Sequence, residues 1–330
     1  MRFRTPIHIN SKEFPSLNHS HELMSLGSCF SEHIGNKLKE GKFTCCVNPY
    51  GVLYNPASIA KALYEIAGGV QYKCDDLFYF GEQWHSWMHH GSFSSVEAND
   101  SVKIINKSLI EAHTKLKKID YLFLTFGSAW IYKLKETGEV VSNCHKKPER
   151  EFCRERLTVD SIVATYKELI DSLLQINPHL QLVFSVSPIR HIRDGLPENQ
   201  ISKSILLLAI NELVQIYPTK VYYFPAYEIV LDELRDYRFY ADDMVHPSKV
   251  AVEYIWDRFS TTFFDQSTSK LLEECNKIKR GLDHRPSDSK SNSYVTFLED
   301  LIGKMEQISI NNPKLDFTKE IELCRIRLKR

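Results

Sequence analysis

Two short stretches of the chain carry side chains able to form a nucleophile and a base. The first is Gly27-Ser28-Cys29-Phe30, which follows an apolar run and precedes a helical pattern. A small residue at a strand-to-helix turn exposes the next side chains at the end of a sheet, and the helix N-terminus favours a thiolate or an oxyanion there. The alternative is an ordinary turn that buries its cysteine.

The second stretch, Asp243-Met244-Val245-His246, places a carboxylate three residues before a histidine. A turn of this length lets the carboxylate accept the imidazole N–H, which fixes the tautomer and leaves the other ring nitrogen free as a base. Pro247 starts the next helix and keeps His246 outside it. A surface histidine before such a proline gives the same pattern. The motif therefore indicates a catalytic base only when it is taken together with the cysteine turn.

Five apolar runs predict the strands that position these residues, at 22–27, 42–48, 119–126, 180–186 and 220–224. Helical patterns separate them, and this alternation predicts an α/β fold with a parallel sheet covered on both faces. Ligands of such sheets bind outside the carboxyl ends of the strands. The cysteine turn and the histidine loop are expected to meet at that edge.

Composition excludes several classes of protein. Lys plus Arg and Asp plus Glu both number 42, so no basic field predicts a nucleic-acid partner. No run approaches the ~20 apolar residues of a membrane span, and the N-terminus has no secretory pattern, so we expect a cytoplasmic protein that does not bind membranes. The eight cysteines form no C-x-x-C pair and are expected as thiols.

The chain divides into two parts by composition. Residues 1–264 form the predicted α/β domain, with a core from about 22 to 264, and residues 265–330 are rich in Lys, Glu and Ser with helical periods. We interpret the second part as a helical extension used for packing, and as a possible surface for a homo-oligomer. Residues 69–99 lose any period, and residues 133–156 are polar and predicted as a loop.

Several ordered motifs resemble one known family. They are GSCFS after the first strand, NPYGVLYNP, LTFGSAWIY, SNCHK, SVSPIRHIRDG with ENQ and SK following, and DMVHPS. They resemble the GSCFA domain family, within the SGNH (GDSL-like) hydrolase superfamily, from about Leu23 to Phe264. The resemblance implies a flavodoxin-like, three-layer α/β/α fold with a five-stranded parallel sheet. It also implies chemistry on an ester or a related acyl compound, for which we expect no cofactor.

The sequence departs from the superfamily at the nucleophile. The superfamily turn reads G-D-S-L, and its third position is Cys29 here, while Ser28 stands where the superfamily has aspartate. By this register Cys29 is the nucleophile, His246 its base and Asp243 the partner of the base. A slip of one residue would instead present Ser28 and bury Cys29.

A second departure concerns the oxyanion hole. The superfamily's G-x-N-D block reads Gly127-Ser128-Ala129-Trp130 here, so the asparagine that donates to the oxyanion is absent. The resemblance then leaves backbone N–H groups as donors, those of Cys29 or Phe30 and of Gly51, unless Asn143 or Ser128 substitutes. Losing one such donor typically slows turnover ~100-fold or more.

Other candidates follow strand ends or lie in the irregular segment. We predict that His145, Arg190 and His191 bind a substrate carboxylate or hydroxyl groups, the alternative being solvated loops. Trp130 is a candidate wall for stacking a sugar or acyl group, although aromatic residues more often belong to a core. His85, His89 and His90 include an i, i+4 pair, but no third ligand of suitable spacing is visible. We therefore predict no metal and interpret them as core or pocket histidines, with His89 a candidate for substrate contact.

These observations give a leading hypothesis and two alternatives. The leading hypothesis is an acyl-ester hydrolase that forms a covalent acyl-enzyme on a small-molecule or glycan acyl substrate. The first alternative is an acyl transferase with an acyl thioester donor. The second is a non-catalytic carbohydrate-binding module on the same fold.

Overall fold

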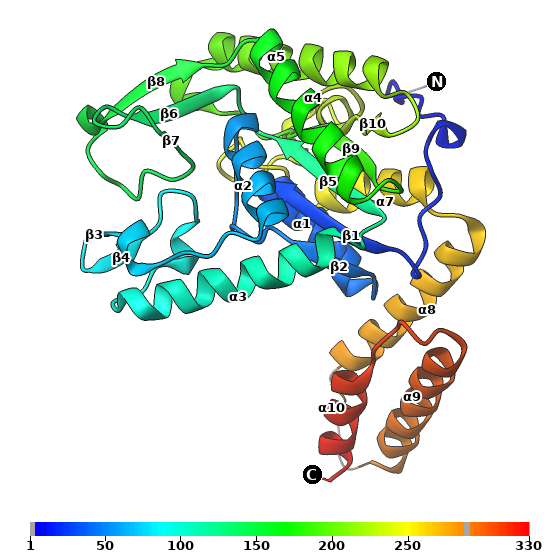
Figure 1. Cartoon of the computed structure of the whole chain (residues 1–330). Coiled ribbons are helices and arrows are strands. Elements are labelled where there is room, and N and C mark those ends of the chain that lie inside the picture. The colour runs from blue at the N-terminus through cyan, green and yellow to red at the C-terminus, as the bar shows by residue number, and fades with distance from the viewer. Residues whose placement is uncertain (1–3, 285, 287–290, 330) are drawn as a thin grey trace.

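The computed structural model describes residues 4–284, 286 and 291–329 of the chain. Its centre is a five-stranded parallel sheet in the order β2-β1-β5-β9-β10 (Figure 1). The strands are β1 (Glu22–Gly27), β2 (Thr44–Val47), β5 (Tyr121–Phe126), β9 (Gln181–Val186) and β10 (Val221–Tyr223). The predicted fold class, a five-stranded parallel sheet in an α/β protein with C-terminal helices, is confirmed.

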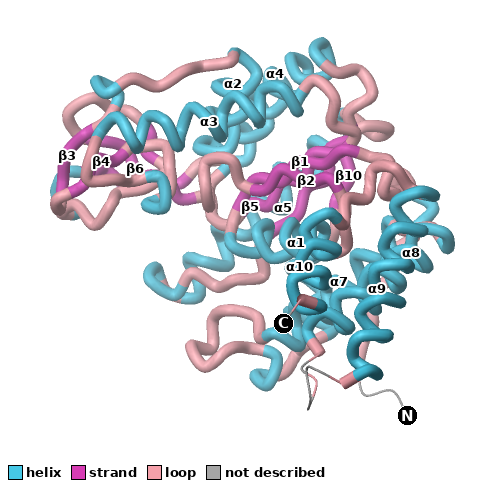
Figure 2. Tube along the Cα trace, turned by 90° about the horizontal axis from the view of Figure 1, so that it is seen from below, coloured by secondary structure: helices cyan, strands magenta, loops and turns pink. Residues whose placement is uncertain are grey.

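Helices cover both faces of the sheet (Figure 2). One face is covered by α2 (Pro56–Gly68), α3 (Ala98–Leu116), α4 (Val159–Ile176) and α5 (Leu196–Ile216). The other is covered by α1 (Cys29–Glu40) and α7 (Lys249–Phe263).

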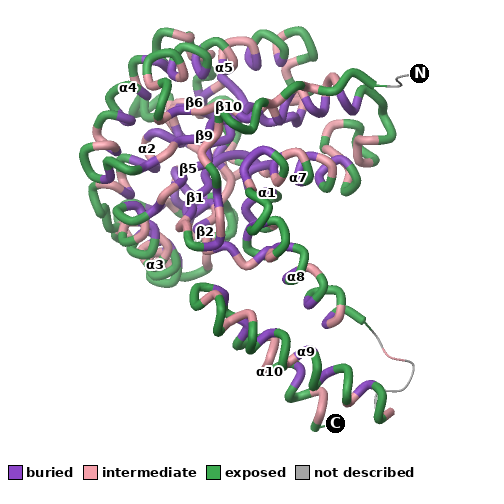
Figure 3. The backbone as a smooth tube through the Cα atoms, turned by 90° about the vertical axis from the view of Figure 1, so that its right-hand side faces the viewer, coloured by how far each residue is buried: buried purple, intermediate pink, exposed green. Residues whose placement is uncertain are grey.

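Strand β5 shows how the sequence divides between these two layers. Leu122, Leu124 and Phe126 belong to the hydrophobic cluster with α2 to α5, whereas Tyr121 and Phe123 belong to the cluster with α1 and α7. Successive side chains of a strand point to opposite faces, so a strand with apolar residues at nearly every position must be covered on both sides. Figure 3 shows this burial concentrated in the sheet and in the inner sides of the helices.

Polar residues begin the helices that start at the carboxyl edge of the sheet. Ser28 caps α1 by accepting a hydrogen bond from the N–H of Phe30, and Asn55 caps α2 by accepting one from Ser58. Ser248 caps α7 in the same way. Such caps satisfy N–H groups that have no partner within the helix, and they fix where each helix begins.

Gly27 is required by a close approach at the end of β1. Its φ is +147°, and a Cβ there would lie 2.3 Å from the carbonyl oxygen of Thr125 on β5. Any side chain would therefore push the two strands apart. The N–H of the next residue, Ser28, donates to that same oxygen over 3.3 Å.

Residues 133–156, predicted as a polar loop, instead form most of a three-stranded antiparallel sheet. Its strands are β6 (Trp130–Leu134), β7 (Val140–Val141) and β8 (Phe152–Arg156), with β6 in the middle. Cys153, Arg154 and Glu155 are exposed, so β8 lacks the apolar alternation that marks a half-buried strand. Pairing with β6 decides its conformation.

The irregular segment 69–99 also contains a short antiparallel pair, β3 (Phe78–Phe80) and β4 (Gln83–His85). Among the described residues, no helix is long and apolar enough to cross a membrane.

The last helices form a hydrophobic cluster of their own. They are α8 (Gln266–Asp283), α9 (Asn292–Asn311) and α10 (Thr318–Leu328). They contact the α/β domain at the C-terminal end of α1, where Leu272 of α8 lies against Gly41. Lys42 also pairs with Glu320 over 2.6 Å and lies over the ring of Phe317.

Lys203 is a fully buried lysine on α5 that joins the ends of β5 and β9. Its Nζ donates to the carbonyl oxygens of Gly127, over 2.6 Å, and of Ser187, over 2.7 Å. Burial, together with the positive charge of Arg190, lowers the pKa of Lys203 to about 7. A neutral amine has two N–H groups, which is the number these two carbonyl groups accept.

We predict that Lys203 makes the stability of the chain rise with pH. The folded pKa of about 7 lies below the ordinary lysine pKa of 10.5. Between these values the unfolded chain holds a proton that the folded chain lacks, so raising the pH favours folding, by up to about 1.4 kcal/mol per pH unit. The free energy of unfolding of the wild type, minus that of Lys203→Met, should therefore increase across this window.

The measurement is denaturant unfolding at a series of pH values. Lys167→Met, at an exposed position on α4, is the matched control and should show a constant difference from the wild type. A Lys203→Met difference that is constant or decreases with pH would contradict the prediction.

Candidate active site

A cleft of about 630 Å³ lies at the carboxyl edge of the central sheet. We call it the carboxyl-edge cleft. Residues that follow β1, β2, β5 and β9 line it, together with residues from β6 to β8 and from the loop before α7. They include Ser28, Cys29, Tyr54, Asn55, Ser128, Trp130, Asn143, Arg154, Ser187, Arg190, His191, Asp194 and His246. Cys29 and His246 are 217 positions apart in the sequence. The cysteine turn and the histidine loop nevertheless line the same cleft.

Ser28 and Cys29 both line this cleft but differ in their freedom to react. Ser28 is 1% exposed, and its hydroxyl oxygen accepts the N–H of Phe30 as the cap of α1. Cys29 is the first residue of the helix, is partly exposed and has a free thiol. A helix N-terminus stabilises negative charge at that position.

Tyr54 is the side chain in contact with the Cys29 thiol. Its hydroxyl lies 3.6 Å from Sγ of Cys29, within hydrogen-bond range for sulfur. Burial raises the pKa of Tyr54, and negative charge on Cys29 raises it further. The phenol therefore keeps its proton at neutral pH and can donate it to a thiolate.

Asp243 orients the imidazole of His246. Nδ1 of His246 lies 2.6 Å from one carboxylate oxygen, and the other oxygen accepts the backbone N–H groups of Val245 and His246, each over 2.9 Å. These backbone N–H groups and the imidazole lower the pKa of Asp243 to about 2. The carboxylate therefore stays charged at neutral pH, holds the Nδ1–H tautomer and leaves Nε2 available as a base.

The structure connects Cys29 to Tyr54 by a hydrogen bond, and it places His246 across the same cleft without such a bond to the thiol. Catalytic hydrogen bonds are often long before a substrate binds. The loop of His246 is held by the N–H of Ala241, which donates to the carbonyl of His246, and by the N–H of Ser248, which donates to Phe239.

Three of the expected oxyanion donors already have acceptors inside the protein. The N–H of Phe30 donates to Ser28, and the N–H of Gly51 donates to the carbonyl of Asn48 over 2.7 Å. The N–H of Ser128 donates to the carbonyl of Tyr54 over 2.9 Å, and its hydroxyl, the group that would replace the asparagine, lies 3.3 Å from the hydroxyl of Ser202. These three backbone N–H groups are therefore not free to donate to an oxyanion.

Three other donors in the cleft have no acceptor among the described residues. They are the backbone N–H of Cys29 and the side-chain amides of Asn55 and Asn143. The oxygen of Asn55 accepts the N–H of Ser58, and the oxygen of Asn143 accepts the N–H of His145, so each amide has a fixed orientation. Asn55 adjoins Tyr54 and is 6% exposed.

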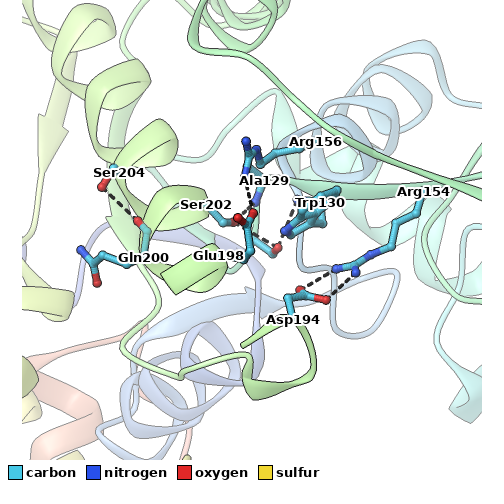
Figure 4. Close-up of polar contacts among 10 residues, drawn as sticks. Ala129, Trp130, Arg154, Arg156, Asp194, Glu198, Gln200, Ser202 and Ser204 are labelled. Carbon is cyan, nitrogen blue, oxygen red and sulfur yellow. Dashed lines mark hydrogen bonds and ion pairs between the residues drawn. The ribbon is translucent and has the colours of Figure 1, made fainter. Parts of the chain in front are cut away.

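One wall of the cleft is built from Trp130 and Arg154 (Figure 4). The guanidinium of Arg154 lies 4.3 Å from the centre of the Trp130 ring. Its two terminal nitrogens contact the two carboxylate oxygens of Asp194. The N–H of Ala129, next to Trp130, donates to the Ser202 hydroxyl over 2.8 Å. Trp130 thus has a fixed orientation, as a stacking wall requires.

Arg190 and His191 lie in the loop after β9 and line the cleft. Nε of Arg190 and Nε2 of His191 are buried without a hydrogen-bond partner among the described residues. Burial, with the positive charge of Lys203 next in size, lowers the pKa of His191 to about 4. His191 is therefore neutral at pH 7, whereas the guanidinium of Arg190 is charged.

His89 and His145 do not line the cleft. His89 is 1% exposed, stacks on Tyr50 with ring centres 4.3 Å apart, and contacts the hydroxyl of Ser86. Nε2 of His145 lies 2.9 Å from the carbonyl oxygen of Ser86. Burial lowers the pKa of His89 to about 3 and that of His145 to about 4, so both rings are neutral at pH 7, His89 in the core and His145 half-buried in its loop.

His85 lies in β4, so the i, i+4 pair of His85 and His89 does not lie on one helix face. Among the described residues, no group of three or more His, Cys, Asp and Glu side chains is placed to hold a metal.

Sequence reasoning missed Tyr54, Asn55, Arg154 and Asp194. Asn55 was recognisable as a helix start before Pro56, and Tyr54 precedes it, so their place after β2 was a usable signal. Arg154 and Asp194 meet only because β8 folds beside the loop after β9, and no spacing in the sequence indicates that contact.

Comparison with known proteins gives two family matches. The model of the GSCFA family matches residues 22–259, and that of the GSCFA domain protein, C-terminal domain, matches residues 275–330. A search of curated proteins returned no match.

Among solved structures, the chain resembles an acetyl xylan esterase (Est2A) from the rumen bacterium Butyrivibrio proteoclasticus, with a TM-score of 0.34 and 10% identity. The likeness covers 74% of this chain and 64% of that esterase, less than two thirds of its length. A likeness this weak carries no argument about activity. The family match covers well over half of the sequence, and the chain therefore belongs to the GSCFA family.

Proposed function

We propose that the chain is an acyl-ester hydrolase that forms a covalent acyl-enzyme on Cys29, in the manner of SGNH hydrolases. One observation carries the proposal: a partly exposed thiol at a helix N-terminus shares the cleft with the imidazole of His246, whose tautomer is fixed by Asp243. A nucleophile, a base and an orienting carboxylate are the parts that acyl transfer needs.

The reaction follows from these roles. Nε2 of His246 takes the thiol proton, and Sγ attacks the ester carbonyl to form a tetrahedral oxyanion. The carbon–oxygen bond to the alcohol then breaks, and His246 gives the proton to the departing alkoxide. In the second half His246 takes a proton from water, the hydroxide attacks the thioester, and the acid and the free thiol are released.

Two further groups support this chemistry. Tyr54 keeps its proton and donates to Sγ, which holds the thiolate toward the cleft. The N–H of Cys29 and the amide of Asn55 donate to the oxyanion in the absence of the superfamily's asparagine, with the amide of Asn143 as a third donor. Each donor of this kind typically speeds turnover ~100-fold.

The choice of Cys29 over Ser28 rests on their different contacts. The hydroxyl of Ser28 is buried and occupied as the cap of α1, so using it as a nucleophile would leave the N–H of Phe30 without its acceptor. The thiol of Cys29 has no such structural duty.

We predict that Cys29→Ala loses at least ~1,000-fold in turnover of short-chain aryl esters, because the covalent route is removed. Ser28→Ala should lose about 1 kcal/mol of stability from the missing cap and keep most of its turnover. Mass spectrometry should find the acyl group of a slowly hydrolysed ester on the peptide that contains Cys29.

Cys153→Ala is the matched control, since Cys153 is an exposed thiol on β8 that does not line the cleft. An active Cys29→Ala beside an inactive, folded Ser28→Ala would reverse the assignment. A folded wild type that binds glycans and neither turns over esters nor becomes acylated would instead indicate a binding module.

We predict that Asp243 acts as a charged partner of His246 throughout the working pH range. Its folded pKa of about 2 is lower than the ordinary aspartate pKa of 3.8, so its contribution to stability is present above pH 3.8 and is lost only as the pH falls through about 2. The acid limb of the pH–rate profile must therefore come from a group other than Asp243. Asp243→Asn should lower turnover by ~100-fold or more, because the imidazole of His246 loses the carboxylate that fixes its tautomer.

Asp242→Asn provides the control, because Asp242 is an exposed neighbouring carboxylate with no hydrogen bond to the ring. The readout is the pH–rate profile with one aryl ester. Turnover of Asp243→Asn within ~3-fold of the wild type across this profile would count against the assigned roles.

We also predict that a chain ending after residue 264 keeps its turnover within ~3-fold. The extension contacts the C-terminal end of α1, and Cys29 lies at the N-terminal end of that helix, ~17 Å away by the helical rise. Stability should fall because Leu272 no longer packs in its cluster. A truncated chain with native circular dichroism and no turnover would show that the extension supports the cleft.

A further inference from the structure

Three arginines line the carboxyl-edge cleft, and two of them already have an anionic partner. Arg154 is held by both oxygens of Asp194, and Arg193 pairs with Glu149. Arg190 has no hydrogen bond and no ion pair among the described residues. Of the three arginines, Arg190 is therefore the one whose charge is not neutralised by a carboxylate in the part of the chain that the structure describes.

The surroundings of Arg190 make this lack of a partner costly. Its neighbours include Lys203, Tyr227 and Tyr240. Burial raises the pKa of both phenols, and the positive charge of Arg190 opposes that rise. The phenols remain neutral at pH 7, so nothing in this group supplies a negative charge. A partly buried cation without an anion costs free energy, which a bound anion would recover.

The donors beside Arg190 are also arranged for a ligand. Nε of Arg190 is buried and unpaired, and Nε2 of His191 is unpaired beside it. The N–H of His191 donates to the side-chain oxygen of Asn199 over 2.8 Å, which fixes the backbone of this loop. A guanidinium offers a planar pair of N–H groups that match carboxylate or phosphate oxygens.

We propose that Arg190 binds an anionic group of the substrate, a carboxylate or a phosphate, inside the carboxyl-edge cleft. Anion binding by Arg190 does not require the proposed function. The identity of the bound molecule does rest on it: the anionic group would belong to an ester whose acyl chain ends in a carboxylate or whose alcohol is phosphorylated. The neutral ring of His191 lies beside the anion and adds a hydrogen bond, while Arg154 stays with Asp194 and supports Trp130.

Binding is measured first, by calorimetry on the full chain with glutarate, inorganic phosphate and glutaramide. Glutaramide has the length of glutarate without its charge. We expect at least one of the two anions to bind ~10-fold or more tightly than glutaramide, and Arg190→Gln to lose that preference, a change of about 1.4 kcal/mol. If glutarate binds more tightly than glutaramide, the anionic group of the substrate is a carboxylate, and if phosphate does, it is a phosphate.

Arg193→Gln is the matched control. It removes the same charge from the same cleft, but from an arginine paired with Glu149, so anion binding should stay within ~2-fold of the wild type. Arg190→Lys keeps the charge, lacks the planar fork and should fall between the wild type and Arg190→Gln. It also answers the question if Arg190→Gln does not fold.

Kinetics separate this inference from the proposed function. With 4-nitrophenyl hydrogen glutarate, Arg190→Gln should raise KM ~10-fold, and with neutral 4-nitrophenyl acetate KM should not change. Anion binding lost in Arg190→Gln supports the inference even if no ester is turned over. Turnover of both esters with no anion preference, or equal anion binding by Arg190→Gln and Arg193→Gln, overturns it and leaves the hydrolase proposal standing.

Discussion

The close approach of β1 to β5 at Gly27 is the constraint on which the cleft depends. Because Gly27 has no side chain, the carbonyl oxygen of Thr125 can lie against it and accept the N–H of Ser28. The chain then turns directly into α1, capped by Ser28, and Cys29 becomes the first helical residue. A wider separation would move the thiol away from the helix N-terminus and from the cleft.

Buried polar contacts tie the neighbouring strand ends to this one. The carbonyl of Gly27 accepts the N–H of Leu53, and the carbonyl of Tyr54 accepts the N–H groups of Gly127 and Ser128. Lys203 on α5 joins the loops after β5 and β9 by donating to a carbonyl oxygen in each. The walls of the cleft are therefore fixed relative to one another by main-chain groups, while side chains such as Tyr54 remain available to a substrate.

The charged side chains of the cleft differ in whether they have a partner of opposite charge. Asp243 and Asp194 are each engaged with one cationic or ionisable partner, His246 and Arg154. Arg190 keeps its charge without a carboxylate among the described residues. Under the proposed function, the cleft has one part in which Asp243 orients His246 as a base, and another in which Arg190 receives an anionic group. An acylated molecule with a negative group would fit both parts.

The sequence alone determined the parallel sheet, because strands such as β5, with apolar side chains at nearly every position, are buried on both faces and alternate with helices. It also determined the local motifs, since a cap, a glycine and a carboxylate three residues before His246 act over a few residues. Only the tertiary structure decided which N–H groups in the cleft lack an acceptor among the described residues. It also decided that Arg154 pairs with Asp194, whereas Arg190 has no ion pair within the described part of the chain. Those outcomes depend on contacts between segments far apart in the chain, and local spacing carries no information about which partner a polar group meets.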